Sequence, residues 1–144
     1  MGDWYVIGNI PTRLERDAFN AVEPYTLQRD GRIDTHFRYR DGSFDGPLKT
    51  INPVGRVVTG TNNAVWGMQF FWPIQAEYVI VDVDPAYEVT IVGRSKRDYA
   101  WIMSRKPTMP EQAYEAAVMR LRSLGYEVDR IRRVPQRWPE APSQ

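Results

Sequence analysis

The sequence has 144 residues, of which 42% are hydrophobic and 26% charged, with a formal net charge of +1 at pH 7. This length suits one folded domain, and this composition excludes a chain that is disordered throughout. The small net charge gives no general attraction to nucleic acid, so we expect no nucleic-acid partner. Cysteine is absent, which excludes disulfides, thiolate metal sites and cysteine nucleophiles.

Short runs of alternating apolar and polar residues fill the first 105 positions, with turn residues between them. The runs are 4–8, 21–29, 32–40, 43–58, 65–72, 76–84, 87–93 and 99–105. This pattern predicts about eight antiparallel strands in succession. Two of the intervening turns are Asp-Gly dipeptides, at 30–31 and 41–42, which favour hairpins. We interpret residues 11–20 as a polar loop.

One helix is predicted after the strands. Residues 108–111 read Thr-Met-Pro-Glu, a capping box with proline in the first turn, and Gly125 is placed to end the helix. Apolar residues then recur at helical spacing, which predicts one buried face. They are Tyr114, Ala117, Val118, Leu121 and Leu124. We expect a short strand within 126–134, a single domain over 1–136, and a loose proline-rich tail over 137–144.

Eight hairpin-connected strands remove their exposed edges by closing into a barrel. The sequence therefore predicts an all-β fold, an eight-stranded antiparallel up-and-down β-barrel, with the helix packed outside and a short final strand. A barrel of this size holds side chains or one small ligand, and has no room for the helix inside. The alternative is a two-sheet sandwich.

Aromatic residues are abundant, with five Trp, eight Tyr and five Phe. Several share a strand face, as Tyr99, Trp101 and Met103 do in the last long run. Such residues can simply fill a core, but large rings and flexible methionines also suit the wall of an apolar pocket.

The sequence offers little for catalysis. His36 is the single histidine, so one chain has no metal site of two or three histidines. His36 and Asp34 form the one candidate acid–base pair, although a lone histidine on a strand is more often a wall or surface residue. Asp82 and Asp84 share a face near a strand end, where capping a turn before Pro85 is more common than cation binding. We expect no catalytic residue, no metal and no cofactor.

The last quarter of the chain is rich in arginine. The residues are Arg120, Arg122, Arg130, Arg132 and Arg133. A solvated face balanced by acidic residues is the ordinary interpretation. Attraction to an anionic membrane surface is the alternative.

The opening run GDWYVIG and the closing segment YAWIMSRKPT, with the helix after it, resemble the lipocalin family. Gly2 and Trp4 match the family's G-x-W, and Trp101 and Arg105 match its last barrel strand. The resemblance covers nearly the whole chain and is closest to the bacterial lipocalins and to apolipoprotein D. One departure is the segment Val83-Asp84-Pro85, where the family usually has T-D-Y.

The resemblance implies a barrel that binds, and carries or stores, a small hydrophobic molecule such as a fatty acid or lysophospholipid, without chemistry. It also implies that Arg105 packs across Trp4 at the closed end of the barrel. Together with the alternation, it predicts a set of ligand-binding side chains. They are Tyr25, Trp66, Met68, Phe70, Tyr78, Ile80, Tyr99, Trp101 and Met103.

Two other functions stay open at this point. One is a lipid-modifying enzyme, of isomerase type, on the same barrel, which needs His36 and Asp34 inside it. The other is a protein-interaction barrel with a filled core. The family context favours the periplasm or outer membrane, whereas the missing lipid-anchor cysteine and signal pattern leave the cytoplasm open. We expect a monomer or homodimer.

Overall fold

The computed structural model describes residues 2–10, 16–57, 60, 65–71, 74–83, 88–94 and 97–140, with the side chains of 65–71 and 74–78 excluded. The first strands are β1 (Tyr5–Ile10), β2 (Ala18–Val22), β3 (Tyr25–Leu27), β4 (Ile33–Thr35), β5 (Phe37–Asp41) and β6 (Leu48–Ile51). The later strands are β7 (Val54–Val57), β8 (Val65–Phe71), β9 (Ile74–Val83), β10 (Val89–Gly93), β11 (Ala100–Ser104) and β12 (Arg132–Arg133). The helix α1 spans Glu111–Ser123, and a 3₁₀ turn, η1, spans Val128–Arg130.

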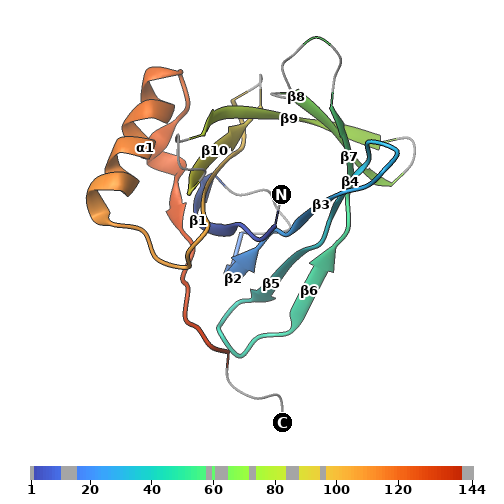
Figure 1. Ribbon diagram of the computed structural model, residues 1–144. Coiled ribbons are helices and arrows are strands. Elements are labelled where there is room, and N and C mark those ends of the chain that lie inside the picture. Colours follow the sequence, from blue (N-terminus) through green and yellow to red (C-terminus); the bar gives the residue numbers. More distant parts are fainter. Residues whose placement is uncertain are drawn as a thin grey trace.

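All these strands belong to one antiparallel sheet that curls into a barrel (Figure 1). Its hydrogen-bonded order is β3-β4-β7-β8-β9-β10-β11-β1-β2-β5-β6, with β12 added beside β1. The path has two ends and is not a closed ring. The strands at one end are β3, β4 and β7, and those at the other end are β2, β5 and β6. The pairs β2/β3, β4/β5 and β6/β7 are each consecutive in the chain, so both ends are built from the same three chain segments and the sheet curls round on itself. The eight predicted strands are β1, β2/β3, β4/β5, β6/β7, β8, β9, β10 and β11.

Prolines explain two of the three bends that split these strands. Pro24 separates β2 from β3 and Pro53 separates β6 from β7. Proline has no backbone N–H, so it interrupts the ladder, but its carbonyl still accepts. His36 N donates to Pro24 O at 3.1 Å and Thr35 N donates to Pro53 O at 3.1 Å. The three segments therefore bend together and remain bonded at the bend.

Two apolar clusters lie on opposite faces of the barrel wall. The cluster inside the barrel, here the interior cluster, includes Trp4, Val6, Tyr25, Ile33, Phe37, Tyr39, Val92, Trp101 and Met103. The cluster between wall and helix, here the helix-side cluster, includes Ile7, Ile10, Ile91, Ala100, Ile102, Tyr114, Ala117, Leu121 and Tyr126. Alternation along β11 divides its residues between the two, as a period of two requires.

The helix lies outside the barrel beside β1 and β10 (Figure 1). Tyr114, Ala117 and Leu121 are buried on its inward face, as the spacing predicted. Gly125 follows the helix with a φ of +93°, a conformation that favours glycine, so the predicted C-terminus is confirmed. Of the described elements, none is a helix long and apolar enough to cross a bilayer.

The predicted capping box is wrong. The N-cap is Pro110, and no side chain caps the helix. Because the helix begins at Glu111, Thr108 lies two positions too early to reach the amide that a capping box serves. The carbonyl of Pro110 accepts the first helical bond from Tyr114 N at 3.0 Å instead.

Other local predictions also needed correction. The loop expected over 11–20 is wrong at its end, because residues 18–20 already belong to β2, where Ala18 and Asn20 are buried. Within the strand expected over 126–134, Val128–Arg130 form the 3₁₀ turn and Arg132–Arg133 pair with β1. Two further predictions fall outside the described residues. One is the turn expected at Asp84 and Pro85, and the other is Trp72, which ended one predicted run.

We expected residues 137–144 to form a loose tail, but residues 137–140 contact the barrel. Arg137 N donates to Asn20 Oδ1 at 2.7 Å, and Asn20 Nδ2 donates to Arg137 O at 3.0 Å. The Trp138 ring packs edge-on against Tyr5, with 5.6 Å between centroids. Glu140 forms an ion pair of 2.9 Å with Arg40. Asn20, with a φ of +50° at a register shift in β2, therefore holds this segment together with Arg40.

Candidate functional site

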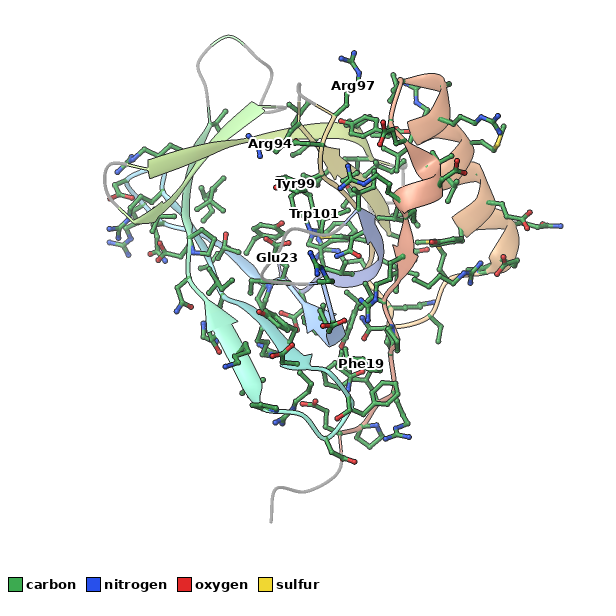
Figure 2. The ribbon with its side chains drawn as sticks, turned by 180° about the vertical axis from the view of Figure 1, so that it is seen from behind. Phe19, Glu23, Arg94, Arg97, Tyr99 and Trp101 are labelled. Atoms are coloured by element: carbon green, nitrogen blue, oxygen red, sulfur yellow. The ribbon has the colours of Figure 1, made fainter. Side chains whose placement is uncertain are left out.

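The aromatic face of β11 lies inside the barrel (Figure 2). Trp101 is 5% exposed and Met103 is 1% exposed. Tyr99 is half-buried and packs against the same cluster, with its ring 6.5 Å from that of Trp101. The intervening Ala100 and Ile102 contact the helix side. The three residues thus form one continuous strip of the inner wall.

The facing wall is formed by three other aromatic residues. Tyr25, from β3, is 5% exposed, and Phe37 and Tyr39, from β5, pack together with ring centroids 5.3 Å apart. The sequence prediction included Tyr25 but missed Phe37 and Tyr39. The signal was present, because Ile33, Thr35, Phe37 and Tyr39 alternate through the bend.

Polar side chains also lie on the inner face. Asn9 is 2% exposed and pairs with Trp101, so the two share the inner face. Glu23 is 2% exposed, and its backbone exchanges hydrogen bonds with that of Trp4, which places it on the same face. Figure 2 shows Glu23 within the ring of strands. Sequence analysis missed both residues, since a polar residue in an alternating run is ordinarily assigned to solvent.

Two inner-wall oxygens have unmet hydrogen-bonding capacity. Asn9 Oδ1 and Thr35 Oγ1 are buried and have no hydrogen-bond partner. A buried acceptor without a donor costs free energy, so such atoms are candidates to bind a polar group of a ligand. Asn9 is the stronger candidate because it neighbours Trp101.

A stacked cation lies just after the end of β11. The Arg105 guanidinium lies 3.9 Å from the centroid of the Trp4 ring. Its Nη1 also donates to Asp3 O at 3.1 Å. A Cβ on Gly2 would lie 3.1 Å from that Nη1, so glycine gives the guanidinium room. This is the contact that the family resemblance implies for Trp4 and Arg105.

The remaining predicted ligand-binding residues lie on β8 and β9. The backbone pairs Trp66 with Val57 and Tyr78, and Met68 with Gly55. Phe70 falls at a register shift in the β8–β9 pairing. The side chains of these four residues lie outside the described part of the chain. Ile80 pairs with Val92 of the interior cluster and also borders a cleft at the barrel's outer side.

The candidate acid–base pair does not lie inside the barrel. His36 is exposed, and its Nδ1 lies 2.5 Å from Asn52 Oδ1. Asp34 accepts a hydrogen bond from Gln28 at 2.8 Å and lies 4.0 Å from Arg32. Both alternate with the buried Ile33, Thr35 and Phe37, so they belong to the outer face. Among the described residues, no three His, Asp or Glu side chains form a metal-binding group.

Most of the C-terminal arginines have a local partner. Arg120 lies 3.9 Å from Asp82 and Arg130 lies 3.7 Å from Glu127. Arg133 pairs with Glu111 and lies 4.0 Å from the centroid of the Tyr114 ring, and the hydrogen bond that Arg133 donates to the Glu111 carboxylate raises the pKa of Arg133. These pairs support the interpretation of this region as a solvated face.

A wall of eight strands around an aromatic interior, with a stacked cation at one end and a helix outside, defines a lipocalin-type binding barrel. The lipocalin-like domain family matches residues 1–136, and the chain belongs to that family. Lipocalins bind small hydrophobic ligands and are generally binding proteins, not enzymes. The predicted fold class is confirmed.

Relatives of known name are similar over most of the chain. Temperature-induced lipocalin-1 of Arabidopsis thaliana is 26% identical over 94% of this chain and 76% of its own length. The outer membrane lipoprotein Blc of Citrobacter freundii is 28% identical over 91% of this chain and 73% of its own. Apolipoprotein D of Macaca fascicularis is 28% identical over 79% and 62%.

Solved structures agree in fold. Lobster apocrustacyanin A1 has a TM-score of 0.74 at 12% identity, over 94% of this chain and 77% of its own. The cockroach allergen Per a 4 has a TM-score of 0.71 at 19% identity, over 96% and 86%. At such identities the likeness shows the fold alone.

Proposed function

We propose that this protein binds a single-chain lipid, a fatty acid or lysophospholipid, inside the barrel. The observation that carries the proposal is the inner wall of Tyr99, Trp101 and Met103 facing Tyr25, Phe37 and Tyr39. Burial of apolar surface supplies the affinity, at about 0.8 kcal/mol for each methylene before the costs of association. Flexible Met103 and the flat rings adapt to a chain of no fixed conformation.

Inner-wall polar groups give such a ligand a preferred orientation. The acceptor Asn9 Oδ1 pairs with a hydroxyl, such as the glycerol hydroxyl of a lysophospholipid. This hydrogen bond would satisfy a buried acceptor that has no partner in the empty protein, and it would therefore contribute to the free energy of binding. Glu23 adds a buried carboxyl on the same face. These groups favour a ligand with a hydroxyl-bearing end over a pure hydrocarbon.

A fluorescence titration tests the proposal. Adding palmitate or lysophosphatidylcholine should quench intrinsic tryptophan emission saturably. Trp101→Phe keeps an aromatic wall but should remove most of the quench. Trp138→Phe is the matched control, because Trp138 packs outside the barrel against Tyr5. Absence of saturable binding, or equal loss of the signal in both variants, would show that the ligand does not occupy the interior.

The proposal also covers how the protein meets a membrane and how many copies of the chain associate. We infer that a lipid carrier of this kind loads at a membrane surface and acts as a monomer or homodimer. Native mass spectrometry of freshly purified protein reports the oligomer and any co-purified lipid together.

A further inference from the structure

The chain that follows β12 fills a gap in the barrel wall between β1 and β2. Strand β1 pairs with β2 at Tyr5 and Val22. Farther along, Gly8 and Asn9 of β1 pair with β12 instead. The opposite edge of β1 pairs with β11, so β12 takes the place beside β1 that β2 holds at Tyr5. We call residues 134–138, which continue from β12, the seam segment.

The seam segment is hydrogen-bonded to both strands that it separates. Val134 N donates to Ile7 O of β1 at 2.9 Å. On the other side, Asn20 N of β2 donates to Pro135 O at 2.8 Å. Figure 1 shows the chain at this point, in red, beside β1. Over this part of the wall, β1 and β2 are therefore connected through the seam segment.

The side chain of Gln136 joins the two strands by itself. Its Nε2 donates to Val6 O of β1 at 2.8 Å and to Ala21 O of β2 at 3.1 Å. Trp138 Nε1 donates to Gln136 Oε1 at 2.7 Å. An indole N–H can only donate, so this contact fixes the oxygen end of the amide and points its NH₂ group at the two carbonyls.

The inner side of the seam segment belongs to the wall of the aromatic interior. Val134 is 4% exposed and is a member of the interior cluster, as Val6 and Ala21 are. The preceding residue, Arg133, faces the helix, with its guanidinium 4.0 Å from the centroid of the Tyr114 ring. Alternation along an extended chain then places Val134 inside. Displacing the seam segment would open the interior from the side.

The seam segment is held by fewer ladder bonds than the strands beside it. Strand β12 ends at Arg133, and Pro135 has no N–H to donate. By contrast, β1 and β11 are paired along their length, from Tyr5 with Ser104 to Ile10 with Ala100. Parts of a fold that break few bonds on opening do so at a lower free energy than the whole. We therefore expect the seam to open before the rest of the wall.

We propose that the seam segment is a side gate to the interior, with Gln136 as its latch. The gate rests on the proposed function, because the ligand that it admits is the lipid of the interior site. Removing one strand from between two neighbours leaves those neighbours roughly 10 Å apart, which is wide enough for an extended hydrocarbon chain. The lipid enters and leaves between β1 and β2 while the gate is open.

Hydrogen exchange tests whether the seam opens as a unit. The amides of Asn20, Val134 and Arg137 each donate across the seam. Their protection factors should be similar to one another and at least roughly tenfold lower than that of Ile102 in β11. Gln136→Leu should lower all three and leave Ile102 unchanged. Protection equal to that of Ile102 in the wild type would contradict the gate.

Stopped-flow measurement of the tryptophan quench by palmitate tests whether the gate controls access. Gln136→Leu removes both latch bonds, so it should raise the association and dissociation rate constants together, by roughly tenfold. The equilibrium constant should stay within about twofold, because a gate changes the barrier and not the bound state. Gln112→Leu is the matched control, since Gln112 is exposed in the first turn of α1, and its rates should equal those of the wild type.

Three results would overturn the gate. The first is unchanged rates in Gln136→Leu, which would leave the interior site intact and place the entrance elsewhere. The second is faster dissociation with unchanged association, which would make Gln136 a support of the bound state. If Gln136→Leu does not fold, Trp138→Phe replaces it, because it removes the indole donor that orients the amide. Trp138→Phe should raise both rate constants by a smaller factor, and rates equal to the wild type would be the third.

Failure of the gate and failure of the proposed function give different results. If the wild type shows no saturable quench with palmitate, lipid binding in the interior is wrong and the gate has no ligand to admit. If the wild type binds palmitate and the variants do not change its rates, only the gate is wrong.

Discussion

The Arg105 guanidinium stacks on the Trp4 ring at 3.9 Å, joining the last long strand to the segment before the first. The contact links positions 101 residues apart in sequence. A partly buried cation over tryptophan contributes about 0.5–2 kcal/mol.

We therefore predict that Arg105→Leu lowers stability by about 0.5–2 kcal/mol and leaves lipid affinity nearly unchanged. Chemical denaturation followed by circular dichroism, with palmitate titrations alongside, checks both halves. Arg122→Leu, an exposed charge on α1, is the control and should change neither. A large loss of affinity with intact stability would place Arg105 in the ligand site.

Asn9→Leu should raise the stability of the empty protein and weaken binding of hydroxyl-bearing lipids. The substitution removes a buried acceptor that has no partner, and replacing such a group with an apolar one of similar size is often neutral or stabilising. Thermal unfolding and titrations with lysophosphatidylcholine and palmitate give the comparison. Affinity for lysophosphatidylcholine should fall more than that for palmitate, and an equal change for both would remove Asn9 from ligand recognition.

Gly93→Ala should destabilise the fold by about 1–3 kcal/mol, because overpacking forces neighbours to move. Its Cβ would lie 2.1 Å from Tyr126 OH and 2.9 Å from Tyr126 Cζ. Adding Tyr126→Leu to Gly93→Ala should cost less than the sum of the two single changes. Additive costs in a double-mutant cycle would show that the two residues do not collide.

Docking of residues 137–140 should weaken in acid. The side-chain hydrogen bond from Arg40 lowers the pKa of Glu140 from its ordinary value near 4.5. A carboxyl with a lowered pKa stabilises the folded state above its ordinary pKa, and this contribution is lost as the pH falls through the folded value. The protection of the 136–140 amides, measured relative to the intrinsic exchange rate at each pH, should therefore fall below pH about 4.5.

Glu140→Gln should lower the protection of these amides already at pH 7, and should lose the acid-dependent fall in protection due to this group. Glu115→Gln, exposed on α1, is the control and should behave as the wild type does. If wild type and Glu140→Gln share one pH profile, the Arg40–Glu140 pair does not hold the segment.

Sequence patterns identified most of the fold because alternation and helical spacing report burial directly. Ala100 and Ile102 reach the helix while Trp101 and Met103 reach the interior, as a period of two demands. The strand boundaries were harder to predict from the sequence, because the bends at Pro24 and Pro53 depend on hydrogen bonds between neighbouring strands. The tail was unpredictable for a similar reason: its partner, Asn20, is a bulge residue more than a hundred positions away.

The ligand-site prediction likewise succeeded where one strand carries the signal and failed where contacts between strands decide burial. Trp101 and Tyr25 stood out because large rings on an alternating face are visible in one strand. Asn9 and Glu23 did not, because their burial depends on which face of β1 and β2 the bulges turn inward. Phe37 and Tyr39 could have been found, because their alternation with Ile33 and Thr35 continues through the bend between β4 and β5.

The most direct test of lipid binding in the interior is an NMR experiment with uniformly ¹³C-labelled palmitate. We predict intermolecular nuclear Overhauser effects from the palmitate chain to the Met103 methyl and the Trp101 indole. Effects confined to Val81 and Leu124 on the outer side, or no saturable binding, would contradict the account.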